Sequence, residues 1–379
     1  MKVAHVVRQY LPSIGGMEEV VRNLVQYQHT STTYQPYVVT LDRVFREPNQ
    51  ALPVHETLDG IPVHRLPYSG SERYPWCPQV LQKLREADLV HVHGVDFFFD
   101  FLAWTKLLHG KPLVASTHGG FFHTQFAQRL KKIYFHSMTR MSCMAYNRVI
   151  ATSDNDGDIF SQILGDRKLK VIENGVDIQK FDDASSQSLL PELIYFGRWS
   201  VNKGLLETLD VLAALCAQQP QTPWHLTIAG REYDLTAQAI LDHAAQKGLA
   251  DRVTIFPGPT NQDLRALIAK ASYFICMSHH EGFGIAPIEA MSAGLVPILS
   301  PIPPFKRLVD STGVGLVLAS SDLATQGKQI AELHTRLIQQ LGAGQDHRAA
   351  ARNAAQAYSW KDVAARYTQQ YNQVMKVTQ

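Results

Sequence analysis

The sequence predicts an α/β protein with two doubly wound parallel sheets, each covered by helices. Three observations predict this fold class. Short apolar runs rich in β-branched residues alternate with helical stretches along the chain, a pattern typical of parallel sheets. The runs fall into two successive series separated by a polar stretch. The chain has 379 residues, 45% of them hydrophobic, so it can form two cores of ordinary size.

The first series of apolar runs predicts an N-terminal sheet. Its strands are expected at 3–7, 36–40, 62–66, 88–93, 112–117 and 148–153. The dipeptide Asn174-Gly175 then predicts a turn, and the polar residues 182–188 are expected to form a spacer. The second series predicts a C-terminal sheet. Its strands are expected at 193–198, 225–230, 252–258, 272–278, 295–300 and 313–319. We therefore expect an N-terminal domain at 1–178 and a C-terminal domain at 179–356.

The last predicted element is a long amphipathic helix within 357–379. Apolar residues recur there at helical spacing, namely Val363, Tyr367, Tyr371 and Val374. This spacing indicates that one face of the helix packs on a core.

Composition and charge exclude several classes of protein. The net charge of +2 is too small to indicate nucleic acid as a partner. The four cysteines are scattered without a C-x-x-C pair, so neither a zinc site nor a disulfide framework is indicated. The N-terminus does not read as a signal peptide, and no uncharged apolar run reaches the roughly 20 residues of a membrane span. We expect a protein that is soluble or peripheral at a membrane.

A pair of glutamates, Glu281 and Glu289, brackets a glycine-containing loop in the sequence HHEGFGIAPIEAMSAG. Pro287 suits the first position of a helix and Gly294 suits the residue after its end. A short helix is therefore predicted at 288–293, with Glu289 in its first turn, where its charge would complement the helix dipole.

The loop ahead of that helix contains Gly282 and Gly284, whose lack of a Cβ atom lets backbone amides approach a ligand closely. Amides beside a helix N-terminus suit a phosphate, and carboxylates beside a phosphate suit sugar hydroxyls. The alternative from these residues alone is an ordinary strand–turn–helix connection with a capping acid.

A second motif, GRWSVNKG, puts Arg198 and Lys203 in a loop at the carboxyl end of a predicted strand. Two cations there suit a diphosphate, with arginine giving forked hydrogen bonds and lysine a point charge. The alternative is a solvated loop in which these side chains have no ligand.

Two further motifs follow strands of the N-terminal series. Gly15-Gly16 lies between the first strand and the first helix, where it serves either as a tight turn or to bring amides close to a ligand. It is not G-x-G-x-x-G, so the dinucleotide fingerprint of nicotinamide-dependent oxidoreductases is missing. His118 follows another strand in STHGG and could contact a sugar hydroxyl or a phosphate. His91 and His93 are expected to be structural.

The segment between Asp100 and Asp154 contains no acidic residue. Its basic residues are Lys106, Lys111, Arg129, Lys131, Lys132, Arg140 and Arg148, and its interleaved aromatic residues are Phe121, Phe122, Phe126, Tyr134 and Phe135. Basic and aromatic side chains together suit anionic lipid head groups or a lipid-linked phosphate. The alternative is a basic helix face that only contacts solvent.

These motifs, together with ENGVDIQKF and the final YSWKDVAARY, occur in the order and spacing of a known family. The chain resembles the retaining glycosyltransferases with two Rossmann-like domains and an E-x7-E motif (GT-B fold, glycosyltransferase family 4 type) over nearly its whole length. The resemblance implies an N-terminal acceptor-binding domain, a C-terminal nucleotide-sugar-binding domain, and a C-terminal helix that packs back on the N-terminal domain.

The resemblance also implies roles for matching residues. Arg198 and Lys203 would bind the diphosphate of the nucleotide sugar, with the amides around Phe283 and Gly284. Glu289 would accept hydrogen bonds from the ribose. Glu281 would face the transferred sugar and His118 would sit at the reaction centre, while Gly16 would contact phosphate from the N-terminal domain. The motifs contain no Asp-x-Asp, so we expect no metal and no other cofactor.

Within that family, HVVRQYLPSIGGMEEVVRNL and VVTLDRVFREP resemble the mannosyltransferases of xanthan- and acetan-type exopolysaccharide assembly. This implies GDP-mannose, a cellobiosyl acceptor on polyprenyl diphosphate, an α-1,3 linkage and the cytoplasmic face of the cell membrane. Arg129, Lys131 and Lys132 are the expected membrane and acceptor surface. The rival functions are a transferase for another nucleotide sugar, such as UDP-glucose, and a catalytically silent partner with the same fold.

Overall fold

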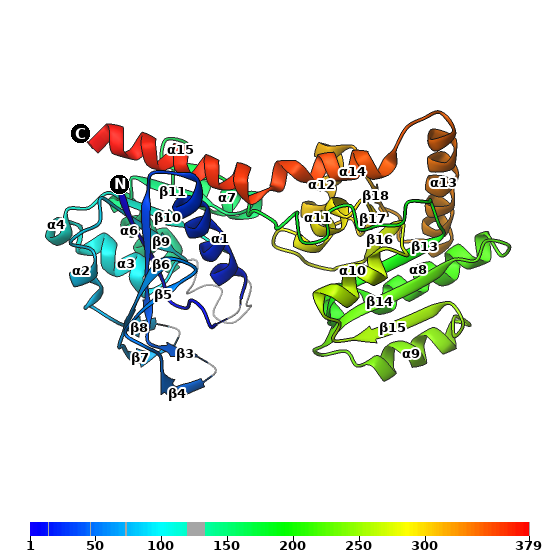
Figure 1. Ribbon diagram of the computed structural model, residues 1–379, viewed down its shortest axis with the longest axis horizontal. Coiled ribbons are helices and arrows are strands. Elements are labelled where there is room, and N and C mark those ends of the chain that lie inside the picture. The colour runs from blue at the N-terminus through cyan, green and yellow to red at the C-terminus, as the bar shows by residue number, and fades with distance from the viewer. Residues whose placement is uncertain (14, 46, 73, 120–132, 379) are drawn as a thin grey trace. The chain divides into compact units, whose positions relative to one another are not determined.

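The computed structural model describes residues 1–13, 15–45, 47–72, 74–119 and 133–378 (Figure 1). The chain forms two compact units. The N-terminal unit comprises Met1–Gly175 and Trp360–Gln379, and the C-terminal unit comprises Val176–Ser359.

The N-terminal unit contains one large sheet with strand order β12-β11-β10-β9-β1-β2-β6-β5. Its strands are β1 (Lys2–Val7), β2 (Gln35–Leu41), β5 (His55–Leu58), β6 (Ile61–Leu66), β9 (Leu89–His93), β10 (Leu113–Ser116), β11 (Arg148–Ala151) and β12 (Leu169–Val171). Neighbouring strands are parallel except β5, which runs antiparallel to β6 at the edge. Two small hairpins lie outside this sheet, β3 (Arg43–Val44) with β4 (Glu47–Ala51) and β7 (Ser69–Ser71) with β8 (Tyr74–Trp76).

The described helices of this unit cover the parallel sheet. They are α1 (Gly16–Ser31), α2 (Val80–Lys83), α3 (Phe97–Trp104), α4 (Lys106–His109), the π-helical turn η1 (Phe135–Thr139), α6 (Arg140–Ala145), α7 (Asp154–Ser161) and α15 (Trp360–Thr378). Helix α15 is the predicted C-terminal helix, and it lies beside α1 as expected. Its apolar face is Val363, Tyr367, Tyr371 and Val374, all buried in the core of this unit.

The C-terminal unit contains a parallel sheet with strand order β15-β14-β13-β16-β17-β18. Its strands are β13 (Glu192–Trp199), β14 (His225–Glu232), β15 (Val253–Pro257), β16 (Tyr273–Cys276), β17 (Val296–Leu299) and β18 (Leu316–Val317). Its helices are η2 (Val201–Lys203), α8 (Leu205–Gln218), α9 (Ala237–Gln246), α10 (Asn261–Ile268), α11 (Ile285–Ser292), α12 (Pro303–Thr312), α13 (Leu323–Gly342), α14 (His347–Ala355) and η3 (Gln356–Tyr358).

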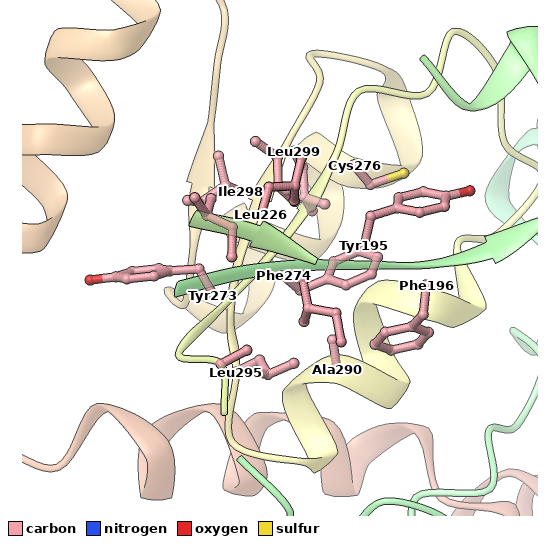
Figure 2. Packing of buried hydrophobic residues seen from close by; sticks show 14 of the residues in the cluster. Tyr195, Phe196, Leu226, Tyr273, Phe274, Cys276, Ala290, Leu295, Ile298 and Leu299 are labelled. Carbon is pink, nitrogen blue, oxygen red and sulfur yellow. The ribbon is translucent and has the colours of Figure 1, made fainter. Parts of the chain in front are cut away.

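The two central strands of the C-terminal sheet contribute large aromatic side chains to its core (Figure 2). Tyr195 and Phe196 on β13 and Tyr273 and Phe274 on β16 are all buried, because a parallel sheet covered on both faces buries successive side chains. The rings of Phe196 and Phe274 lie 4.9 Å apart, tilted against each other. These aromatic side chains fix the two strands whose carboxyl ends carry the candidate site.

All twelve strands expected from the apolar runs are present, and the α/β class with two parallel sheets is confirmed. The sequence did not predict β12, the antiparallel edge strand β5 or the two hairpins. These strands are short and largely exposed or polar, so they lack the buried apolar run that marks a parallel strand.

The polar stretch 182–188, expected as a spacer, is instead packed on the C-terminal unit. Arg348 on α14 donates to Ser185 Oγ at 3.0 Å and to Gln187 Oε1 at 2.7 Å, and it pairs with Asp183. The amide of Ser185 also donates to the carbonyl of Ala293 at 2.9 Å. Because its polar groups have partners from α14 and α11, the stretch is ordered structure that hydrophobicity alone did not reveal.

The chain passes between the units twice, after Gly175 and after Ser359. On the N-terminal side the two passages touch, because a Cβ atom on Gly175 would lie only 2.5 Å from the ring of Trp360. Glycine is thus required at 175 by this close approach. Within the described residues, no helix is both long enough and apolar enough to cross a membrane.

Candidate active site

The strand order of the C-terminal sheet brings two loops together. The chain leaves β13 towards β14 on one side and leaves β16 towards β17 on the other, so the carboxyl ends of β13 and β16 form a topological switch point. Ligands of doubly wound sheets bind at such points because the diverging connections leave a crevice there. Arg198 and Lys203 follow or end β13, and Glu281 follows β16.

Lys203 and Glu281 form an ion pair across this switch point. Lys203 Nζ lies 2.5 Å from Glu281 Oε1, and the same oxygen accepts from Ser278 Oγ at 2.9 Å. Both side chains are partly exposed, so the pair is open to a ligand. Glu281 is therefore fixed by a cation and a hydroxyl, and a charged lysine is held beside it.

Arg198 is differently placed. It is the second-last residue of β13 rather than a loop residue as expected, and its side chain is exposed. Its guanidinium lies over the ring of Tyr233, 4.6 Å from the centroid, and no carboxylate pairs with it within the described parts of the chain. Tyr233 was not predicted from the sequence. It stacks under a cation whose hydrogen-bond donors stay available to an anion.

Gly204 allows the loops after β13 and β16 to approach each other closely. Its φ of 62° is left-handed, and a Cβ atom there would lie 2.0 Å from the carbonyl oxygen of Met277 on the loop after β16. Only glycine fits this conformation and approach without moving one loop away from the other. The glycine of GRWSVNKG thus keeps Lys203 and Glu281 within reach of each other.

The helix after the second loop corrects one prediction. Helix α11 begins at Ile285, so Pro287 is its third residue and Glu289 its fifth, beyond the first turn. Gly284, with a φ of 90°, supplies the N-cap, and Pro287 is tolerated because the first four amides of a helix have no partner within the helix. The proposed interaction of Glu289 with the helix dipole is therefore wrong.

The end of α11 is as expected. Gly294 has a φ of 94°, its amide donates to the carbonyl of Met291, and the amide of Leu295 donates to that of Ala290. This pair of hydrogen bonds is a Schellman motif, which needs the left-handed residue that glycine provides.

The two glycines of the loop differ in their role. Gly284 is constrained by packing, since a Cβ atom on it would lie 2.9 Å from the ring of Phe305. Gly282 has open space around its Cα. Phe283 packs its ring against that of Tyr358 at 5.9 Å between centroids, so its side chain anchors the loop.

Glu289 lies beside a lysine that was not predicted as a site residue. Lys180 Nζ is 3.0 Å from Glu289 Oε1, and the lysine also lies 4.8 Å above the ring of Phe181. Both side chains are partly buried. The motif ENGVDIQKF contains Lys180, but only the fold brings it to α11, because the two residues are 109 positions apart.

In the N-terminal unit, His118 lies in an unusual backbone conformation. Its φ is 53°, in the left-handed region that non-glycine residues seldom adopt. Asp156 on α7 holds the turn on both sides, because its Oδ2 accepts from Thr117 Oγ1 at 2.5 Å and from the amide of Gly119 at 2.9 Å. Strained backbone that neighbouring groups fix in this way is common at functional sites.

Asp156 was missed in the sequence, where the motif is ATSDNDGD. An Asp-x-Asp sequence, Asp154-Asn155-Asp156, does occur there, outside the motifs considered for a metal. The observed role of Asp156 is to accept hydrogen bonds from the His118 turn.

His118 is hydrogen-bonded to further histidines. Its Nε2 lies 2.9 Å from His93 Nδ1, and His93 Nε2 lies 3.0 Å from His5 Nδ1. Burial lowers the pKa of His118 to about 3. It also lowers the pKa of His5 to about 4, against the opposing effect of the hydrogen bond that His5 donates to Gln28. Burial and the neighbouring histidines hold the pKa of His93 well below its usual range. The rings are therefore neutral at pH 7.

Three of these buried histidines, His5, His91 and His93, have ring nitrogens within 4.8 Å of one another. They are the candidate metal ligands that the described residues offer. Each already has hydrogen-bond partners, however, and His91 bonds to Tyr371 and Ser116 at 2.6 and 2.8 Å. The expectation that His91 and His93 are structural fits their complete burial.

Gly16 is the first residue of α1, and a Cβ atom on it would meet nothing within 4 Å. Neither Gly15 nor Gly16 adopts a left-handed backbone, so the conformational reason for glycine is missing here. The open space at Gly16 leaves room for a ligand near its backbone.

The acid-free segment is only partly described. Arg129, Lys131 and Lys132 lie outside the described residues, as do Phe121, Phe122 and Phe126. Phe135 is buried in the core and the hydroxyl of Tyr134 donates to Asp100, so these two aromatic residues do not form an outward surface as expected. Other apolar side chains of the segment's described helices, such as Leu107 and Met144, remain exposed.

Two doubly wound sheets, with two cations and a carboxylate at the switch point of the second, define a two-domain glycosyltransferase of the GT-B class. The fold agrees with solved structures. A glycosyltransferase from Rickettsia africae matches with a TM-score of 0.73 at 15% identity, over 99% of this chain and 98% of that one. Sucrose-phosphate synthase from Thermosynechococcus elongatus matches with a TM-score of 0.68 at 19% identity, over 99% of both chains.

Sequence comparison identifies the family. The profile described as Glycosyltransferase Family 4 matches residues 14–180, and that described as Glycosyl transferases group 1 matches residues 179–356. The GDP-mannose:cellobiosyl-diphosphopolyprenol alpha-mannosyltransferase of Xanthomonas oryzae pv. oryzae is 48% identical over 100% of this chain and 98% of its own length. The enzyme of that name from Komagataeibacter xylinus is 42% identical over 99% of this chain and 94% of its own length. The chain belongs to the family 4 glycosyltransferases.

Proposed function

We propose that this glycosyltransferase moves mannose from GDP-mannose to cellobiosyl-diphosphopolyprenol, with retention of configuration and an α-1,3 linkage, in exopolysaccharide biosynthesis. The observation that carries this proposal is the full-length identity of 42–49% to three alpha-mannosyltransferases with this printed donor and acceptor. The charges at the switch point of the C-terminal sheet support it.

The C-terminal unit would bind GDP-mannose. Arg198, which has no acidic partner in the described structure, and Lys203 would bind the diphosphate. The amides of Phe283 and Gly284, just ahead of α11, would add neutral donors to the same phosphates. Glu289, oriented by Lys180, would accept from the ribose hydroxyls.

The reaction would be driven by electrostatic stabilisation of the leaving GDP. The bond from the anomeric carbon to the diphosphate oxygen breaks, and the acceptor hydroxyl oxygen attacks that carbon from the same face. The hydroxyl proton passes to the departing phosphate. Fixed cations at the diphosphate stabilise the growing charge without reorganising during the step. Glu281 would hold a hydroxyl of the transferred sugar, which fixes its position for the attack.

The N-terminal unit would bind the acceptor and complete the reaction centre. His118 would contact the transferred sugar, and Gly16 would let the start of α1 approach the donor phosphate. The expected domain boundaries, 1–178, 179–356 and 357–379, would then separate acceptor binding, donor binding and the returning helix. We propose no metal and no cofactor, since the cations of the chain supply positive charge at the diphosphate.

We also propose that the protein works at the inner face of the cell membrane, because its acceptor would be lipid-linked. The described part of the acid-free segment exposes an apolar patch, which we call the α4–α6 patch. It consists of Leu107, Leu108, Met141 and Met144. Leu107 is 97% exposed and Met144 is 71% exposed. Exposed apolar residues with basic neighbours suit an anionic lipid surface.

The elements of this patch are neighbours within the N-terminal unit. Lys106 Nζ on α4 donates to Asn147 Oδ1 at 3.3 Å, two residues after the end of α6. Lys168 Nζ donates to the carbonyl of Met144 at 2.7 Å. The patch therefore has lysines at its border, whose charge would attract anionic head groups.

The test is direct transfer. Purified protein is incubated with GDP-mannose, GDP-glucose or UDP-glucose and a cellobiosyl-diphosphopolyprenol analogue, and the product is analysed by NMR for anomeric configuration and linkage. We expect transfer from GDP-mannose with an α-1,3 product. A higher kcat/KM with UDP-glucose would replace this proposal by the first rival.

The silent-partner rival is tested in the same assay. Glu281→Gln removes the carboxylate charge with little change of shape. It therefore serves as the reference for an inactive protein that keeps the fold. If wild type and Glu281→Gln are equally inactive with every donor while the folded protein binds none of them, the catalytic proposal is wrong.

A further inference from the structure

The buried histidines of the N-terminal unit form a continuous hydrogen-bonded chain that ends at His118. The contacts run from His118 to His93 at 2.9 Å, from His93 to His5 at 3.0 Å, and from His5 Nε2 to Gln28 Oε1 on α1 at 2.9 Å. His5, His93 and Gln28 are fully buried, and His118 is partly exposed.

The end of this chain sets its direction. In the structure Gln28 turns Oε1 towards His5, and an amide oxygen only accepts, so in this arrangement His5 Nε2 carries a proton. A neutral imidazole carries one proton, so His5 Nδ1 must accept from His93 Nε2. By the same rule, His93 Nδ1 accepts from His118 Nε2. His118 then has its proton on Nε2, and its Nδ1, which has no hydrogen-bond partner among the described residues, is a free acceptor.

His91 packs beside the hydrogen-bonded histidine chain but is not part of it. His91 packs against His93 with ring centroids 3.9 Å apart, and both its nitrogens are used by Tyr371 and Ser116. Tyr371 comes from α15, so the C-terminal helix packs against the ring of His91. His91 is as buried as His93 but has no bond to His118, which makes it a matched control.

We propose that His93 and His5 are positioning residues for the transfer reaction, because they fix the ring of His118 and keep its proton on Nε2, so that Nδ1 accepts a hydrogen bond from a hydroxyl of the bound sugar. This proposal rests on the proposed role of His118 at the reaction centre. A chain of buried polar groups in which each donor meets one acceptor has few alternative arrangements, so it holds its last member in one orientation.

A metal ion is the competing explanation for buried histidines at this spacing. It would have to replace the hydrogen bonds that occupy the nitrogens of His5 and His93. The hydrogen-bonded chain already uses all these nitrogens.

The first experiment reads the tautomer directly. Long-range proton–nitrogen NMR of the full chain labelled in histidine reports which ring nitrogen carries the proton. We expect His118 as the Nε2–H form in the wild type, a mixture of both forms in His93→Phe, and the wild-type form in His91→Phe. An unchanged His118 tautomer in folded His93→Phe overturns the proposal.

The second experiment measures kcat and the donor KM of the variants. We expect His93→Phe to lower kcat about tenfold with a donor KM within twofold of wild type, and His91→Phe to stay within twofold to threefold. His93→Asn puts an amide oxygen near the position of Nδ1, so it should restore most of kcat. If His93→Phe does not fold, Gln28→Met replaces it, since it removes the acceptor that sets the direction of the chain.

The outcomes separate this proposal from the proposed function. The tautomer needs no substrate, so it can be read even if GDP-mannose proves to be the wrong donor. A mixed tautomer in His93→Phe combined with full activity in His118→Ala overturns the positioning role while leaving the transferase activity in place. Stoichiometric zinc in the purified wild type, measured by plasma mass spectrometry, also overturns the proposal.

Discussion

The two units bury different chemistry at the centre of similar sheets. The central strands of the N-terminal sheet, β1 and β9, carry His5, His91 and His93, which are neutral and hydrogen-bonded in the interior. The central strands of the C-terminal sheet, β13 and β16, carry aromatic residues in the interior, and Lys203 and Glu281 form an ion pair just after their carboxyl ends. The same fold thus holds polar groups either as neutral rings inside or as charges at its rim.

The difference follows from the cost of burial. A buried polar group is tolerated when it is hydrogen-bonded, whereas a buried charge is far more costly. The histidine rings at the centre of the N-terminal sheet avoid that cost because they stay neutral. The C-terminal unit avoids it because Lys203 and Lys180 remain partly exposed beside their glutamates. The first arrangement is therefore sensitive to pH, and the second is suited to binding anions.

The largest expected effect of this difference is on acid stability. The pKa of His5 is lowered to about 4, and the pKa values of His91 and His93 are also well below 6.5. The unfolded chain therefore binds protons below pH 6.5 that the folded unit does not, so stability is complete above pH 6.5 and falls as pH drops towards the folded values. For each of these rings, the free energy of unfolding falls by up to about 1.4 kcal/mol per pH unit between the unfolded and folded pKa values.

The C-terminal unit should lose less stability in acid. Its histidines with a lowered pKa are His334 and His347. Hydrogen–deuterium exchange of the full chain at pH 7 and pH 5, corrected for intrinsic rates, checks each unit separately. His91→Phe should make the loss in the N-terminal unit smaller. Equal loss of protection in both units would remove the contrast.

The next largest effect is expected at the cations of the C-terminal unit. Lys203→Ala or Arg198→Ala should lower kcat/KM roughly 10²-fold, because each removes a fixed donor from the proposed diphosphate site. Steady-state kinetics with GDP-mannose measures this effect. The control is Lys247→Ala, which breaks another ion pair of the same unit, Lys247 with Asp210 at 2.7 Å. Near-wild-type rates in both folded site variants would exclude these cations from the site.

The two glutamates should differ in what they bind. Glu289→Gln is expected to weaken donor and free GDP alike by about tenfold, the effect of losing one charge-assisted hydrogen bond of about 1.5 kcal/mol. Glu281→Gln should spare GDP binding and lower turnover, because its partner would be the sugar. Lys180→Met should act as Glu289→Gln does, since Lys180 orients that carboxylate. Calorimetry with GDP tests whether the two glutamates have these different roles. Equal loss of GDP affinity in both variants would show that they do not.

The smallest effect on catalysis is expected from changes at the proposed membrane surface. Reversal of Arg129, Lys131 and Lys132 to glutamate should weaken binding to anionic vesicles by roughly two decades at low salt, at about 1 kcal/mol for each basic side chain. Leu107→Gln with Met144→Gln should cause a further loss that salt does not change, because apolar burial is not screened. Liposome flotation at two salt concentrations measures both.

The matched control is charge reversal at Lys328, a basic residue of the C-terminal unit, which should leave binding intact. Activity on a short, water-soluble acceptor should survive all of these changes. Equal flotation of wild type and the triple reversal would leave these basic residues without a lipid partner.

Sequence patterns predicted the fold because its main determinant is local. A parallel strand covered on both faces must be a short, nearly continuous apolar run, and such runs marked every parallel strand of the two described sheets except the short edge strand β12. Edge strands and hairpins lack that signal. The start of α11 was misplaced for a related reason, since Pro287 suits any of the first positions of a helix and only the backbone shows that Gly284 is the N-cap.

The sequence by itself also determined which residue types stand at the candidate site, because Arg198, Lys203, Glu281 and Glu289 lie in recognisable motifs. Only the tertiary structure decided their partners. Lys180 meets Glu289 across 109 residues, and Asp156 meets the His118 turn across 37. The histidine chain joins strands 88 positions apart and reads as isolated histidines along the sequence. Hydrogen bonds and ion pairs act over about 3 Å in space and leave no periodic trace in the sequence, whereas burial of apolar surface does.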